Sequence, residues 1–249
     1  MKSCWASKHS DCEGKISKEH LVSSGVFEQK NIFVQGFDWC KKEKEIGVKN
    51  ITSSILCEKH NNGLSKIDQA GIDAFKTIES LLPSHAQSMD VSKAKKYIDG
   101  YNFERWLLKT AINLSVNQNF HIGASMTDSQ IGLPSPYLLA VLFGELDFSH
   151  EMGLYFLFPN DKYDFKAGSL LMSPVVKDQI IVAFIFHIRG IDFVLSLYPG
   201  HTLPSLKSLG VENPTGDFDY VLDVSPQYRS KIFTTKHGSN TKKQIVFRW

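Results

Sequence analysis

The chain has 249 residues, of which 42% are hydrophobic and 22% charged, and its formal net charge is +2. This composition is typical of a globular protein with enough apolar material for a core. It excludes a helical membrane protein, since no run approaches the ~18 apolar residues that a span needs. It also argues against a strongly basic DNA-binding domain, so any nucleic-acid binding should be modest and salt-sensitive. The polar first residues do not resemble a secretory signal, and we expect a cytoplasmic protein.

In chain order, residues 1–83 form a small mixed module that ends in a helix. Apolar residues from Ser65 onward recur with helical spacing and stop at Pro83, a residue that terminates helices. Residues 84–92 are polar and predict a loop. A second helix is predicted over 101–114, and with the loop it makes a helical connector, residues 84–116.

Residues 117–249 form the third part, whose sequence predicts strands from Gly153 onward. Segments rich in branched and aromatic residues, broken by Pro and Gly, are typical of strands. They cover residues 153–159, 169–176, 179–190 and 191–199, with further candidates at 218–222, 230–236 and 243–249. Arg189-Gly190 predicts a tight hairpin. The expected fold is therefore α+β, with an antiparallel β-rich C-terminal domain.

A metal site is predicted from the start of the first helix. Cys57 and His60 are spaced i, i+3, which places both side chains within one turn and within reach of one ion. Tetrahedral zinc usually takes two such pairs, and in a reducing compartment the four cysteines of the chain favour metal binding or burial over disulfides.

The second pair of ligands is less certain from spacing alone. Cys4 and Cys12 are the candidates, although the gap between them is wider than zinc pairs usually have. His9 can replace one of them, and Cys40 stands alone downstream. The alternative interpretation is that these cysteines are simply buried and inert.

Three stretches, taken in this order, resemble the HNH, or ββα-metal, endonucleases: CEGKISKEH (12–20), NITSSILCEKHNN (50–62) and LSKID (64–68). In that family a strand ends in an acidic residue followed by His. A second strand leads into a short helix that carries a zinc half-site, and the residue directly after it faces the catalytic metal. The resemblance covers residues 4–75 and does not extend to the C-terminal half.

The resemblance implies a role for each matching residue. His20 would be the general base, since a neutral imidazole can take the proton of water at physiological pH. Glu19 and Asn61 would bind the catalytic Mg²⁺ or Mn²⁺. The asparagine that orients the base in the family falls on Thr52, with Asn50 nearby. The structural zinc would be held by Cys4, Cys12, Cys57 and His60.

Two further features of this region have alternative interpretations. Ser65-Lys66-Ile67-Asp68 fits a capping box at a helix start, and a contact behind the metal ligands is the other possible role of Asp68. The stretch QGFDW, residues 35–39, lies in a long insertion between the two strands, where it either packs on the module or touches substrate.

The expected function is a metal-dependent endonuclease that cuts double-stranded DNA, of the kind found in bacterial or phage restriction and antiviral systems. The C-terminal domain would recognise the target, a protein partner or a second copy of the chain. The alternative is a non-catalytic zinc adaptor whose β-rich half binds a protein, and a third reading is a nuclease active only inside a complex. His20 discriminates between these readings, since an adaptor has no use for a general base.

Overall fold

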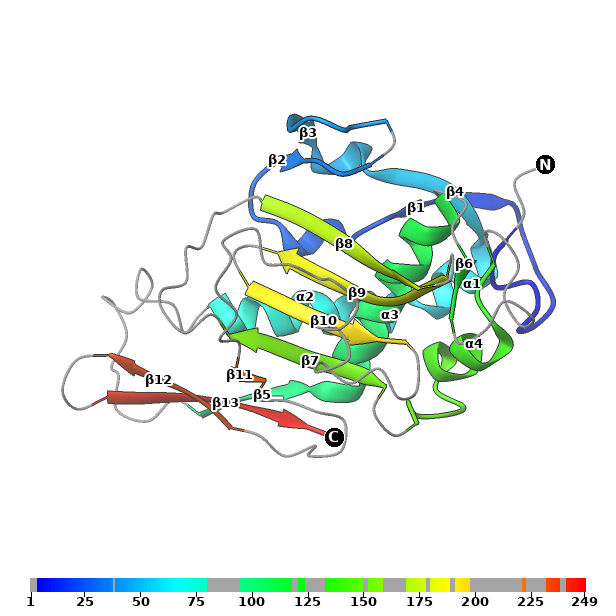
Figure 1. Ribbon diagram of the computed structural model, residues 1–249. Helices are drawn as coiled ribbons and strands as arrows, with labels where there is room; N and C mark the ends of the chain where they lie inside the picture. The colour runs from blue at the N-terminus through cyan, green and yellow to red at the C-terminus, as the bar shows by residue number, and fades with distance from the viewer. Residues whose placement is uncertain are drawn as a thin grey trace.

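The computed structural model describes residues 4–37, 39–79, 95–117, 121–123, 133–149, 152–158, 169–177, 180–188, 191–197, 221–222, 232–237 and 241–249. They form a mixed α+β fold in which helices and sheets share one core (Figure 1). The predicted loop at 84–92 and the predicted Arg189-Gly190 turn lie outside the described residues.

A large mixed sheet is the main feature of Figure 1. Its strands are β2 (Asn31–Val34), β3 (Lys44–Gly47), β6 (His121–Ile122), β7 (Gly153–Phe158), β8 (Ser169–Lys177), β9 (Ile180–Ile188), β10 (Ile191–Ser196) and β11 (Val221–Leu222). Their order is β11-β7-β10-β9-β8-β2-β3, with β6 beside β9. The strands predicted between Gly153 and residue 199 are confirmed, and β9 and β10 pair antiparallel with Ile188 opposite Ile191.

The antiparallel arrangement expected of the C-terminal part holds for the pairs among β7, β8, β9, β10 and β11, but two further strands join the sheet in parallel. β2, from the N-terminal insertion, joins the sheet parallel to β8, with Phe33 opposite Ser169. β6 is also parallel to its neighbour β9. The insertion between the two strands of the N-terminal module therefore completes the sheet of the C-terminal part.

Two smaller sheets flank the large one. β1 (Ile16–His20) and β4 (Thr52–Cys57) form an antiparallel pair. β12 (Ile232–His237), β13 (Thr241–Arg248) and β5 (Lys95–Asp99) form a three-stranded sheet, in which β13 and β5 are parallel. The connector predicted to be helical thus includes a strand before its helix.

The helices are α1 (Glu58–Gly63), α2 (Ser65–Glu79), α3 (Gly100–Asn117) and α4 (Pro136–Phe143), with short 3-10 turns η1 (Ser24–Val26) and η2 (Val48–Asn50). α2 and α3 confirm the two predicted helices. α4 begins where the Ser135 hydroxyl accepts the Leu138 N–H, and it ends at Gly144, whose φ of 83° lies in the left-handed region that glycine favours. In the described part of the chain, no helix has the length and apolar character to cross a membrane.

α3 is the centre of the packing, because it is buried along most of its length and contacts α2, α4, β4 and β10. α2 approaches it closely at Gly71, where an added Cβ would lie 2.4 Å from the Trp106 ring. Phe75 of α2, Trp106 and Phe103 of α3 and Phe193 of β10 form a cluster of edge-to-face and stacked rings. Residues from all three expected parts therefore share one hydrophobic core.

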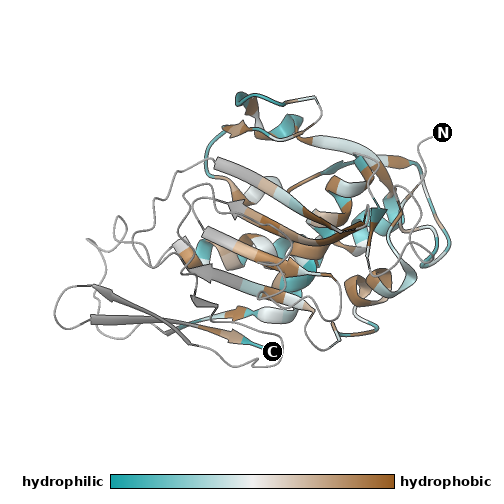
Figure 2. Ribbon diagram, viewed as in Figure 1, coloured by the Kyte–Doolittle hydropathy of each residue, from teal (hydrophilic) through white to brown (hydrophobic). Residues whose placement is uncertain are grey.

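Hydropathy follows this arrangement. Figure 2 shows hydrophobic residues along β9 and on the helices beside the sheet, while hydrophilic residues gather around β3 and η2. The large sheet and the core each include residues from both sides of the boundaries expected at 83 and 116. Neither boundary therefore divides the sheet or the core.

Candidate functional site

The β1–β4 pair and α1 place the predicted site residues at two ends of one small unit. Cys57 ends β4, directly before α1, and lies opposite Ile16 of β1. At the other end of the pair, His20 lies opposite Thr52. The backbone N–H of Glu58 donates to Lys15 and so fixes the start of α1 against the segment before β1.

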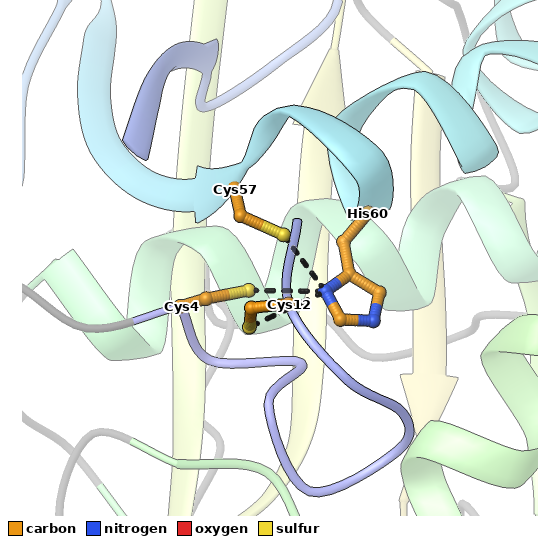
Figure 3. A group of neighbouring side chains, drawn as sticks. All are labelled: Cys4, Cys12, Cys57 and His60. Carbon is orange, nitrogen blue, oxygen red and sulfur yellow. Dashed lines mark hydrogen bonds between the residues drawn. The ribbon is translucent and has the colours of Figure 1, made fainter. Parts of the chain in front are cut away.

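The predicted zinc ligands converge at the Cys57 end (Figure 3). The Nδ1 atom of His60 lies 3.3 Å from Cys4 Sγ, 3.9 Å from Cys12 Sγ and 3.1 Å from Cys57 Sγ. All four ligand atoms lie within 4.8 Å of one another. Ligands of a tetrahedral zinc are about 3.5–3.8 Å apart, so these three sulfurs and one nitrogen can hold such an ion.

The imidazole of His60 is held in the orientation that a metal ligand requires. Its Nε2 atom lies 2.9 Å from the Ser10 hydroxyl, while Nδ1 faces the three sulfurs. A hydrogen bond at the far ring nitrogen leaves the near nitrogen free to donate its lone pair. Burial, with His9 and Lys59 nearby, lowers the pKa of His60 and keeps this ring neutral.

The three thiols differ in how readily they ionise. Burial raises the pKa of Cys4 to about 12, and burial also raises the pKa of Cys12. Burial opposes ionisation of Cys57 as well, but hydrogen bonds from the backbone of His60 and Glu13 and from the other two thiols lower its pKa. Cys57 is therefore the first thiolate of the cluster, and a bound cation would draw protons from the other two.

The two alternative ligands lie in other surroundings. His9 stacks on Phe143 with ring centroids 3.9 Å apart, and its Nε2 atom lies 3.8 Å from a carboxylate oxygen of Glu145. The Cys40 thiol donates to the Val34 carbonyl at 3.1 Å. Among the described residues, the cluster of Cys4, Cys12, Cys57 and His60 is the one group of three or more Cys, His, Asp or Glu side chains that gathers its ligand atoms.

Glu19, the predicted ligand of a catalytic metal, forms a buried ion pair. Its carboxylate lies 2.6 Å from Nζ of Lys109, on α3, and the exposed fractions of the two side chains are 6% and 2%. The same ammonium lies 2.6 Å from Asp68 Oδ2. Burial raises the pKa of Glu19, and Lys109 opposes that rise.

Asp68 is not the helix cap that the sequence predicts. Its N–H donates to Leu64, so the helix begins one residue earlier than the capping box requires and Ser65 is already its first residue. The Asp68 carboxylate instead accepts hydrogen bonds from Ser23, at 2.7 Å, and from Lys109.

Two hydrogen bonds in series join the segment that carries Cys4, a member of the Cys/His cluster, to His20. The indole N–H of Trp5, next to the ligand Cys4, donates to Asn113 Oδ1 at 3.1 Å. The amide nitrogen of Asn113 donates in turn to the His20 carbonyl at 3.2 Å. Trp5 and Asn113 are both buried, so this connection is shielded from water.

The imidazole of His20 is partly buried, and its peptide carbonyl is held by Asn113. Its Nε2 atom is buried and has no hydrogen-bond partner among the described residues. A buried ring nitrogen in this state is uncommon in folded proteins. Burial lowers the pKa of His20, Lys109 lowers it further, and Asp68 opposes both, so the ring is neutral at physiological pH.

The contact of Glu19 with Lys109 does not fit a catalytic divalent cation in the arrangement that the resemblance implies, whereas the contact of Asn61 involves its amide nitrogen and not Oδ1, the atom that would bind a cation. Glu19 already neutralises Lys109. The amide nitrogen of Asn61 donates to the Ser17 hydroxyl at 3.0 Å. Thr52, expected in a loop, is the first residue of β4, and Asn50 is exposed at the end of η2.

The polar residues of α3 are the part of the site that sequence analysis missed. Lys109 and Asn113, spaced i, i+4, reach the β1 strand from the far side of the core. Their signal in the sequence is two polar residues one turn apart within residues 106–114, a stretch that is otherwise apolar except for Thr110, which predicts buried partners.

No family model, curated protein or solved structure that was compared with the chain matches it.

Proposed function

We propose that the protein is an endonuclease that hydrolyses phosphodiester bonds of DNA, with His20 as the general base. The observation that carries the proposal is the state of His20: neutral, half-buried, with an unpartnered ring nitrogen, opposite Thr52 at the end of the β1–β4 pair. The order of β1, β4 and α1, with a Cys/His cluster at the start of the helix, supports it.

In this proposal the residues of the chain have distinct tasks. The imidazole of His20 takes a proton from water as the water oxygen attacks phosphorus, and the bond from phosphorus to the sugar oxygen breaks while that oxygen takes a proton from solvent. Asn113 fixes the backbone of His20 through its carbonyl. The Cys/His cluster holds a structural metal, zinc by its ligand chemistry. Because the Glu19 carboxylate is paired with Lys109, we assign no step to a metal bound by Glu19.

The experiment is nicking of supercoiled plasmid by the purified full chain, with Mg²⁺ or Mn²⁺ and with an EDTA control. We expect nicking by the unchanged protein, and a loss of about 10²- to 10⁴-fold in rate for His20→Ala, the range typical of a general base. His121→Ala, a histidine on β6 that takes no part in the proposed site, is the matched control and should retain activity. Equal rates for His20→Ala and the unchanged protein would contradict the proposal.

The second candidate function is a non-catalytic zinc adaptor that binds a protein partner. The buried Glu19–Lys109–Asp68 contacts favour it, because they use the acidic residue of the HNH-like pattern for packing rather than chemistry. Absence of nicking by the folded, zinc-loaded protein under every metal condition would favour the adaptor.

A further inference from the structure

We infer that residues 30–49, which contain β2, β3 and the turn between them, are an arm that contacts a nucleic-acid strand carrying unpaired bases. The inference rests on the proposed nuclease function and adds to it the surface that holds the substrate. Three observations carry it: a preorganised exposed tryptophan, exposed lysines around it, and the position of the arm next to His20.

Trp39 is held on the surface by the turn before β3. The N–H of Gly36 donates to the Cys40 carbonyl, and the N–H of Cys40 donates back to the Phe37 carbonyl. Phe37 is buried, and the Trp39 ring stacks on it at 5.1 Å with an interplanar angle of 23°. The Trp39 side chain is nevertheless 52% exposed, whereas Trp5 and Trp106 are fully buried. An indole fixed in this way loses little freedom when a base stacks on it.

The surroundings of Trp39 suit a phosphate backbone. Phe33, on β2, is 48% exposed and offers a second aromatic face. Residues 30–49 contain five lysines against three acidic residues, a surplus equal to the net charge of +2 of the whole chain. The five lysines are exposed, and among the described residues none of them forms an ion pair. They are Lys30, Lys41, Lys42, Lys44 and Lys49.

The arm begins and ends beside the proposed reaction centre. Its base is closed by a hydrogen bond from the Val48 N–H to the Lys30 carbonyl, and the next bond inward joins Leu21 to Ile51, the neighbours of His20 and Thr52. Four-residue strands such as β2 and β3 extend for about 13 Å. A strand cut at His20 therefore passes the arm within a few nucleotides of the cut.

The test is binding of a fluorescein-labelled single-stranded DNA oligonucleotide, followed by anisotropy, with full-chain His20→Ala as the parent so that the probe stays intact. Adding Trp39→Ala should weaken binding roughly 5- to 100-fold, the range for loss of one stacked base, and Trp39→Phe should restore most of it. Leu146→Ala, which removes an equally exposed apolar side chain near α4, should leave binding unchanged.

The lysines are tested by the salt dependence of the same binding. Lys41→Gln/Lys42→Gln should reduce the slope of log K against log salt by about 1 to 2, while the control pair Lys66→Gln/Lys76→Gln, exposed on α2, should not. Iodide quenching of tryptophan fluorescence should fall when the oligonucleotide is added and should lose this response in Trp39→Phe.

The outcomes separate this inference from the proposed function. Binding that is as tight with Trp39→Ala as with the parent overturns the role of the arm, even if the unchanged protein nicks plasmid. No binding of single-stranded or duplex DNA at low salt overturns it as well, and favours a protein partner for Trp39. Trp39-dependent binding without any nicking supports the arm and contradicts the nuclease.

Discussion

Lys109 is a single ammonium shared by two carboxylates, and it shows why a buried charge needs its partners. It contacts Glu19 and Asp68 at 2.6 Å each, in a part of the core where only Asp68 retains appreciable contact with solvent. Isolated charges are very costly to bury, so each member of such a group depends on the others.

Replacing Lys109 by Met should therefore destabilise the fold strongly. We expect a loss of about 3–5 kcal/mol in the free energy of unfolding, because Glu19 is left as an unpaired buried carboxylate. The double variant Lys109→Met/Glu19→Gln should recover part of that loss. Urea unfolding measures both, and Lys76→Met, on the exposed face of α2, is the control. A loss below about 1 kcal/mol for Lys109→Met would show that the pair contributes little.

The loss of stability in Lys109→Met should also depend on pH. Because the pKa of Glu19 is raised in the folded state, the fold retains a proton that the unfolded chain has already released, and the free energy of unfolding falls as pH rises through this window. Lys109 holds the pKa of Glu19 down. In Lys109→Met this pKa rises further, so stability continues to fall to a higher pH. The deficit of Lys109→Met relative to the unchanged protein should be larger at pH 7 than at pH 5, by urea unfolding at both. A deficit that is independent of pH would contradict the assignment to Glu19.

At the scale of single residues, the sequence identifies those candidate site residues whose partners are close in the chain. Cys57 and His60 are three positions apart, and the structure brings Cys4 and Cys12 to them. Lys109 could not be assigned to Glu19 in the same way, because their contact joins positions about 90 residues apart and depends on how α3 packs against β1. The capping box at Asp68 failed because α2 already includes Ser65 as its first residue, which moves the cap position to Leu64.

At the scale of elements, the Cys/His cluster joins the segment before β1 to the junction of β4 and α1. Cys4 and Cys12 lie in the segment before β1, which has little regular structure in the described residues, whereas Cys57 and His60 lie at the junction of β4 and α1. A metal that joins both segments converts its binding energy into folding energy.

We expect one zinc ion per chain, lost in Cys57→Ser and retained in Cys40→Ser. The control is well matched, because Cys40 is buried like Cys57 but hydrogen-bonds to the backbone outside the cluster. Metal analysis by mass spectrometry measures the ion, and EDTA should lower the melting temperature of the unchanged protein but not that of Cys57→Ser. Zinc retained in Cys57→Ser would exclude the proposed ligand set.

Elements with a strong pattern were predictable, and those that tertiary contacts create were not. The β-branched and aromatic runs of β7 to β10 and the periodic pattern of α2 locate these elements well. β3 and β5 are short and begin with charged residues, one lysine and a glutamate in β3 and two lysines in β5, so their strand structure follows from the partner strands that they meet. α4 is apolar on all sides and only eight residues long, a pattern that does not separate a helix from a buried strand.

At the scale of the whole molecule, the β2–β8 pair ties the N-terminal third to the C-terminal half. An N-terminal part that is joined to the sheet in this way shares its stability with that sheet. It stays a prediction that the three parts expected from the sequence are separate folding units. Unfolding of a shortened chain tests it directly.

A chain shortened to residues 1–117 should not fold cooperatively. It lacks β8, the partner of β2, and Phe193, which packs against Phe75 and Phe103. Near-ultraviolet circular dichroism and thermal unfolding should show loss of fixed aromatic packing and of a sharp transition, in contrast with the full chain. A sharp transition in the shortened chain would mean that the first part is an independent domain.

The connection from Trp5 through Asn113 to the His20 carbonyl gives the metal cluster a second consequence. Filling of the Cys/His cluster orders the segment that carries Trp5, and Trp5 orders the peptide group of His20. Such a coupling is reciprocal by thermodynamic necessity, so whatever immobilises His20 should also raise the affinity of the Cys/His cluster for an ion at the other end of β1. Loss of the ion would then loosen the end of β1 that carries His20, well before the whole protein unfolds.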